Sequence, residues 1–116
     1  MTSELEKVVA EYKLYAENHG KATLDGDSVK ANINHDKIIE SLHQIRQHGN
    51  EGNVALLLLT DDTNQSVRCL AATHSLNFNE RKAKKVLKKL SKENGIIAFN
   101  AKMVLNEWKK GTLELP

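Results

Sequence analysis

Proline occurs only once in this chain of 116 residues, as the final residue, Pro116. Proline inside a helix removes a backbone donor and clashes with the preceding turn, so helices rarely continue through it. Nothing of this kind interrupts a helix before the chain ends. Runs of strand-forming residues are sparse, and apolar residues recur at helical spacing through most of the sequence. The sequence therefore predicts an all-α fold.

The length of the chain fits a single domain with one hydrophobic core, so we expect one domain over residues 1–116. Cys69 is the only cysteine, which rules out an internal disulfide and suits a reducing compartment. No apolar run reaches the roughly eighteen residues typical of a membrane span. The first residues also lack the basic and apolar regions of a secretory signal. These features indicate a cytoplasmic protein.

Periodic apolar side chains predict about six helices, and the short connections between them make consecutive helices antiparallel neighbours. We expect the first helix to stop at Gly20. Gly49–Asn53 should form a loop, and Asn79 should cap the helix that follows it. The apolar run Val54–Leu59 is compatible with a buried strand, but its helical neighbours favour a short buried helix. We expect residues 112–116 to form a loose end. From Val29 the chain is ambiguous, and a clear apolar stripe predicts a helix only over Ile38–Ile45. The other expected helices are Ser3–His19, Val54–Leu59, Gln65–Leu76, residues 80–93 and Ile96–Lys110.

The fourth expected helix carries two adjacent small residues, Ala71 and Ala72, after an acidic turn. Small side chains let a second helix approach closely. Asp61 or Asp62 can cap the helix start, where unpaired backbone N–H groups favour an anion. Arg68 lies one turn further along, so we expect an ion pair between Asp62 and Arg68.

The last expected helix repeats part of this pattern. Ala101 follows Ala72 by 29 residues, and the apolar positions around the two alanines correspond; an offset of 30 residues instead matches Ala71 with Ala101. This spacing indicates compact helical repeats, in which Ala72 and Ala101 lie at close helix contacts. Trp108 is expected to fill the core at the end of the last helix.

The acidic turn, the Val-Arg pair and the alanine pair resemble a HEAT-type repeat. More of the chain is similar to a small bacterial family of uncharacterised domains. This resemblance implies a compact HEAT/armadillo-like αα-superhelix, a bacterial source and a scaffold that grips other macromolecules. It implies no catalytic residue. The segments that carry it are Leu24–Asp27, Val67–Arg68, Ala71–His74, Phe99–Ala101 and Glu107–Gly111.

No catalytic motif is present. The histidines lack the spacing of a zinc-binding helix, and there is no Gly-rich phosphate loop or paired acid and base. Cys69 lies among apolar residues without an activating base, so it is expected to be packed in the core. His74 should be a half-buried, hydrogen-bonded histidine, whereas His35, Glu40 and His43 should occupy a solvated face. We therefore expect no enzyme, no cofactor, no metal and no small-molecule substrate.

The net charge of +2 hides an asymmetry, because acidic residues dominate residues 1–62 and basic residues dominate residues 63–116. Small size, helical architecture and an acidic half favour a protein-binding module. One specific form is an immunity protein that neutralises a bacterial toxin, because an acidic inhibitor can cover the basic surface of a nuclease. The partner-binding residues expected on this hypothesis are Asp25, Asp27, Asp36, Glu40, Asp61 and Asp62.

The strongest charge feature is the basic run from Arg81 to Lys92. Its apolar residues share one helix face, so its cations should spread over a solvated outer surface. A second hypothesis is nucleic-acid binding through this helix, with contacts from Lys84, Lys85, Lys88 and Lys89. A third is a structural scaffold or self-associating protein. The scarcity of aromatic residues counts against nucleic acid.

Overall fold

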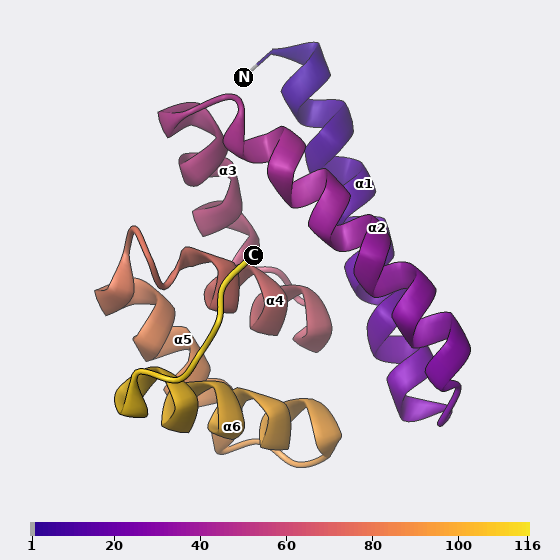
Figure 1. Cartoon of the computed structure of the whole chain (residues 1–116), viewed down its shortest axis with the longest axis vertical. Coiled ribbons are helices and arrows are strands. Elements are labelled where there is room, and N and C mark those ends of the chain that lie inside the picture. The colour runs from indigo at the N-terminus through magenta and orange to yellow at the C-terminus, as the bar shows by residue number, and fades with distance from the viewer. Residues whose placement is uncertain (1) are drawn as a thin grey trace.

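The computed structural model describes residues 2–116, and these fold into six helices without a strand (Figure 1). The all-α prediction is confirmed. Most of the expected helices occur where their apolar periodicity places them, and the differences lie at their ends. The helices are α1 (Ser3–Leu24), α2 (Ser28–Arg46), α3 (Asn50–Leu59), α4 (Gln65–Ser75), α5 (Glu80–Ser91) and α6 (Ile96–Lys110).

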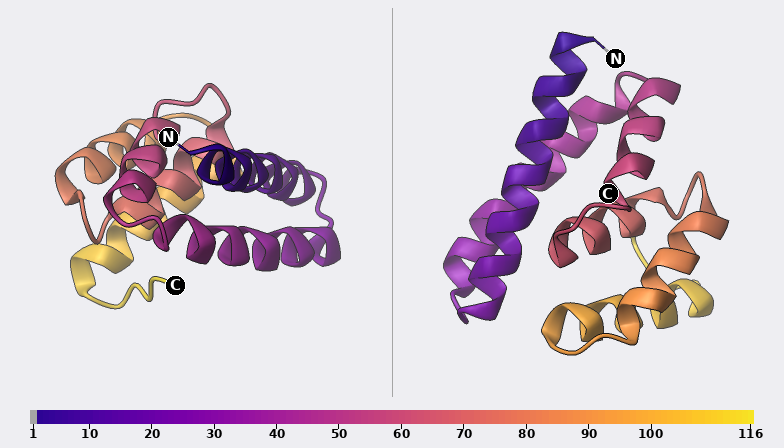
Figure 2. Two further views of the ribbon diagram at one scale, coloured as in Figure 1. Left: turned by 90° about the horizontal axis from the view of Figure 1, so that it is seen from above. Right: turned by 180° about the vertical axis from the view of Figure 1, so that it is seen from behind.

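The helices pack in consecutive pairs, α1–α2, α3–α4 and α5–α6; the first and last pairs are antiparallel, whereas α4 lies across the lower end of α3 (Figure 1). The helix α4 is central, because it packs against α1, α3, α5 and α6, whereas α2 contacts α1 and α3. Seen from above, α1 and α5 lie on one side of the molecule and α2 on the other, whereas α6 runs obliquely from the first side to the second (Figure 2). The basic helix α5 therefore packs against α6 but makes no contact with α2.

The core consists of two groups of buried side chains. The first joins α1 and α2 to Leu56, Val67 and Ala71, and the second joins α4, α5 and α6. Ala72 and Ala101 belong to the second group and are both fully buried. Their prediction is confirmed, because α4 and α6 contact each other directly. The 29-residue offset thus relates the second helices of successive pairs.

Gly20 does not stop the first helix, contrary to the prediction. α1 continues to Leu24, and Gly20 lies buried within it against α4. A Cβ at this position would lie 1.8 Å from the Ser66 Oγ. The glycine therefore allows two helices to approach closely, and the helical hydrogen bonds of α1 outweigh the lower helix propensity of this residue.

The third helix begins at Asn50, before the apolar run that predicted it. The expected loop glycine Gly52 is helical and buried, and a Cβ there would lie 2.0 Å from the Ile45 carbonyl oxygen. The run itself is not wholly buried, because Val54 and Leu58 are exposed. A short helix covers the core with one face only, so an apolar run of this length cannot be buried all round.

The cap of α4 also differs from the prediction. The Asn64 side chain accepts a hydrogen bond from the Val67 backbone N–H and forms the N-cap. Asp62 instead accepts a hydrogen bond from the backbone N–H of Asn64. The acidic turn therefore supports the capping residue rather than capping the helix itself. Asn79 caps α5 as expected.

The segment after α6 is not a loose end. Leu113 and Leu115 are half-buried against the second core group. The Arg46 guanidinium of α2 donates a hydrogen bond to the Pro116 carbonyl oxygen. The segment crosses from α6 toward the middle of the molecule (Figure 1). Apolar side chains at alternate positions hold this tail in place, a pattern too short to be recognised in the sequence.

Candidate interaction surfaces

Among residues 2–116, one buried hydrogen bond joins two side chains, those of Tyr12 of α1 and His74 of α4. The Tyr12 hydroxyl and the His74 Nδ1 lie 2.7 Å apart in a buried hydrogen bond, with the rings edge to face. Burial lowers the pKa of His74 to about 3, and the positive charge of Arg46 acts in the same direction. Burial also raises the pKa of Tyr12. The predicted hydrogen bond of His74 is confirmed, and the ring is fully buried rather than half-buried. The pair joins α1 to α4 as neutral groups.

Cys69 is buried in the second core group, as expected, and burial raises the pKa of its thiol to about 11. A thiolate is the reactive form, so such a thiol reacts slowly at neutral pH. We predict that a thiol reagent modifies Cys69 slowly in the native protein and rapidly in denaturant. Mass spectrometry of timed samples measures both rates. Fast native modification with a low thiol pKa would contradict a purely structural cysteine.

Other combinations of chemically active side chains do not converge. Within residues 2–116, no group of three or more His, Cys, Asp or Glu side chains is arranged to hold a metal ion. The His35 ring faces His19 of α1, with ring centroids 6.0 Å apart.

Within residues 2–116, no helix is long and apolar enough to cross a membrane.

The structure does not bring the six predicted acidic residues together on one surface. Asp61 pairs with Lys82 at 2.8 Å, and Asp62 pairs with Lys13 at 3.0 Å. Asp27 caps α2 through a hydrogen bond from the Lys30 backbone N–H. Asp25 is exposed in the turn between α1 and α2. Three of the six carboxylates are therefore engaged within the fold.

The predicted pair between Asp62 and Arg68 is not formed. Arg68 reaches Glu93, just beyond α5, at 3.3 Å. Burial alone would raise the pKa of the Asp62 carboxyl, but the Asn64 backbone N–H and the Lys13 ammonium hold this pKa below its usual value. The Arg68 charge acts in the same direction from a greater distance. Asp62 and Arg68 both form ion pairs, as expected from the sequence, but their partners are Lys13 and Glu93 rather than each other.

The remaining acidic residues, Asp36 and Glu40, are exposed on α2 and form no ion pair within residues 2–116. They continue a row of exposed residues at spacings of three and four, opposite the buried face of the helix. The nearby Lys37 ammonium lies over the Tyr15 ring of α1, 5.3 Å from its centroid. We call this row the α2 row, and it consists of Val29, Ile33, Asp36 and Glu40.

A row of exposed apolar residues on α6 was not predicted from the sequence, because only the inward-facing residues of this helix were considered. Phe99 is 59% exposed and Met103 is 42% exposed, and Ile96 continues the same face. The spacing of Ile96, Phe99 and Met103, three and then four residues apart, was the available signal. We call these three residues the α6 row. Trp108 packs against the second core group, as predicted, but it is only half-buried there and donates from its Nε1 to Glu80.

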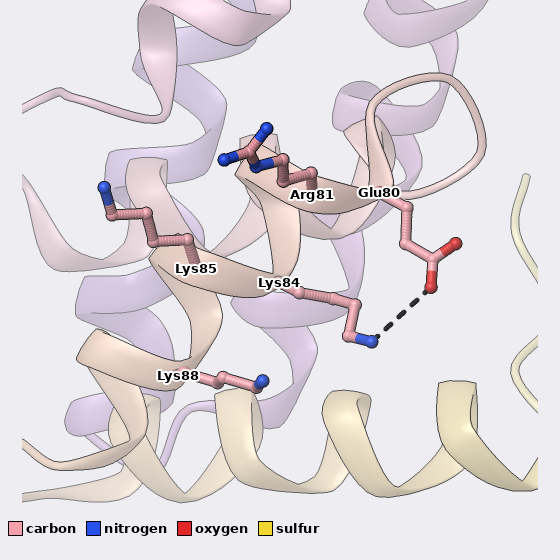
Figure 3. A pocket seen from close by; sticks show the side chains of 5 residues that line it. All are labelled: Glu80, Arg81, Lys84, Lys85 and Lys88. Carbon is pink, nitrogen blue, oxygen red and sulfur yellow. Dashed lines mark ion pairs between the residues drawn. The ribbon is translucent and has the colours of Figure 1, made fainter.

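The basic helix α5 presents its cations around an open pocket of about 620 Å³ (Figure 3). Of the predicted lysines, Lys84 is held by Glu80 at 3.5 Å, whereas Lys85 and Lys88 are exposed and form no ion pair among the described residues. Lys89 is exposed on a flank of the helix, near Asp61. We call the outward cations at spacings of four, three and four residues the α5 row, and they are Arg81, Lys85, Lys88 and Lys92.

Comparisons with known proteins support the architecture alone. No family model matches the chain, and no curated protein matches it. The crystal structure of the protein RPA1889 from Rhodopseudomonas palustris CGA009 is similar, with a TM-score of 0.87 and 22% sequence identity. The likeness covers 99% of this chain and 96% of that one. The two chains therefore share the six-helix fold, and membership of the bacterial family stays a prediction.

Proposed function

We propose that this protein is a helical-repeat module that binds another protein, and that it acts as an immunity protein by neutralising a basic bacterial toxin. The observation that carries the proposal is the α6 row. An aromatic residue and a methionine next to an isoleucine form the kind of apolar centre that is enriched in protein interfaces. Isolated exposed apolar residues are ordinary, but a continuous row on one helix face is not.

The α6 row can contribute much of the binding free energy although it consists of only three residues. Burying a Phe or Met side chain against a partner contributes about 1.5–3 kcal/mol. A few such residues dominate the binding energy of a typical interface. Phe99 and Met103 are therefore the residues expected to contribute most to binding.

The α2 row supports a basic partner. Asp36 and Glu40 form no ion pair among the described residues and can attract cations, and the C-terminal end of α6 lies on the α2 side of the molecule (Figure 2). Exposed charges at the edge of an interface act mainly by accelerating association. Val29 and Ile33 extend the same row with apolar surface.

The proposal predicts that the double variant F99A/M103A loses capture of a protein partner from the source organism. The loss of two buried side chains should weaken binding by at least a hundredfold, following the per-residue values above. Quantitative mass spectrometry of nuclease-treated affinity captures measures this loss. The matched control is L14A/L58A, which truncates two exposed apolar residues on α1 and α3. Equal capture by both variants would contradict the proposal.

The neutralising role requires a second measurement. The captured protein should inhibit growth when expressed alone, and co-expression of the wild-type chain should restore growth, whereas F99A/M103A should not. The variant D36K/E40K should slow association, and E4K/E6K, which changes the net charge equally, should not. If the wild-type chain is a dimer that F99A/M103A converts into a monomer, the row serves self-association and the proposal fails.

A further inference from the structure

We infer that the α5 row is a second and separate binding surface, which holds the phosphate backbone of a nucleic-acid duplex. The inference does not depend on the protein-binding function, because the α5 row shares no residue with the α6 row or the α2 row, and α5 makes no contact with α2. It rests on the charges around α5, on the length of the row and on the charged character of the exposed face of α5.

The carboxylates next to α5 do not neutralise the row. Glu80 is engaged by Lys84 and by the Trp108 Nε1, Asp61 is engaged by Lys82, and Glu93 is engaged by Arg68. The cations in these pairs, Lys84, Lys82 and Arg68, lie outside the α5 row. The four cations of the row form no ion pair within residues 2–116. Their charges are therefore available to an anionic ligand (Figure 3).

The row has the length that a duplex requires. From Arg81 to Lys92 the helix advances by about 16 Å, at about 1.5 Å per residue. A major groove is about 12 Å wide between the two backbones. A helix lying across such a groove can place the cations at its two ends against phosphates of both strands. Because lysine and arginine side chains are long and flexible, small differences in spacing are readily accommodated.

The composition of this face favours a duplex over the other polyanions. A protein interface normally contains an apolar centre, and the exposed part of α5 is charged throughout. Single-stranded nucleic acid is usually held by stacking on aromatic rings. The aromatic residues near α5 do not supply such a platform, because Phe78 is half-buried against the first core group and the Trp108 Nε1 is engaged by Glu80. Phosphate contacts alone bind without sequence preference.

The test is the salt dependence of binding to a labelled mixed-sequence DNA duplex, measured by fluorescence anisotropy. Four phosphate contacts predict a slope of log affinity against log salt of about −3.6. The variant K85Q/K88Q should reduce this slope by about 1.8. The control K7Q/K21Q removes the same charge from exposed positions of α1 and should leave the slope within experimental error. Both variants change exposed helical lysines, and circular dichroism verifies that each remains folded.

The competing ligands are tested with the same full-length protein. An RNA duplex should bind with a similar salt dependence, whereas single-stranded oligothymidine and polyglutamate should bind at least tenfold more weakly at equal salt. Failure of the duplexes to bind at 50 mM salt would overturn the inference. An equal reduction of the slope by K85Q/K88Q and by K7Q/K21Q would overturn it too, because binding would then reflect net charge alone. Preference for polyglutamate would assign the row to an acidic protein.

Discussion

Replacing Gly52 with alanine is expected to lower the free energy of unfolding by about 3 kcal/mol or more, the upper range for overpacked interiors. The new Cβ would lie 2.0 Å from the carbonyl oxygen of Ile45. Because the obstacle is backbone rather than a flexible side chain, α2 and α3 must separate. Alanine otherwise favours a helix by about 1 kcal/mol over glycine, so the collision reverses the usual effect.

Urea denaturation followed by circular dichroism measures this change. The matched control is Glu51→Ala, one residue earlier in the same turn and exposed. That substitution should cost only a few tenths of a kcal/mol, from lost charge near the helix N-terminus. If Gly52→Ala were as stable as the control, α2 and α3 could not be as close as described.

The second large effect is a loss of stability in acid caused by His74. Its pKa lies near 3 in the folded protein and near 6.5 in the unfolded chain. The unfolded state therefore binds a proton that the folded state excludes. The stability associated with neutral His74 is fully present above pH 6.5 and is lost as the pH falls toward 3. The expected loss is roughly 2–3 kcal/mol between pH 6 and pH 4.

Urea unfolding at several pH values, with wild type and His74→Gln compared, isolates this contribution, since the carboxylates titrate in both proteins. The difference between the two curves should shrink or change sign as the pH falls, because glutamine binds no proton. His43→Gln, at an exposed position of α2, is the control and should follow the wild type. Parallel curves for wild type and His74→Gln would contradict the buried neutral histidine.

Much of the fold could be predicted because helical periodicity is a local property of the sequence. The turns, the capping residue Asn79 and the buried alanines Ala72 and Ala101 followed from short segments. The helical positions of Gly20 and Gly52 could not be predicted in this way. Whether Gly20 or Gly52 ends a helix or lies within one depends on the helix that packs against it, here through Ser66 and Ile45. That partner is distant in the sequence or lies across a turn, so local propensity gives the wrong answer.

The candidate surfaces were harder to predict for a related reason. The sequence identified the basic run, but it could not show that Lys84 is paired while Lys85 and Lys88 form no ion pair within residues 2–116. Likewise it could not distinguish Asp36, which is exposed and unpaired among the described residues, from Asp62, which is paired with Lys13. Ion pairs between helices depend on tertiary neighbours that periodicity does not specify.

The tail after α6 changes how this array of helices should lose its structure. In an open solenoid each repeat contacts only its neighbours, so the ends can unfold first. Here the Arg46–Pro116 hydrogen bond joins residues 70 positions apart, and Tyr12–His74 joins residues 62 apart. The first and last helix pairs are thereby tied to the middle and to each other. Native-state hydrogen exchange should accordingly protect the amides of α1 and α6 nearly as well as those of α4, with all three opening together in a single cooperative unit.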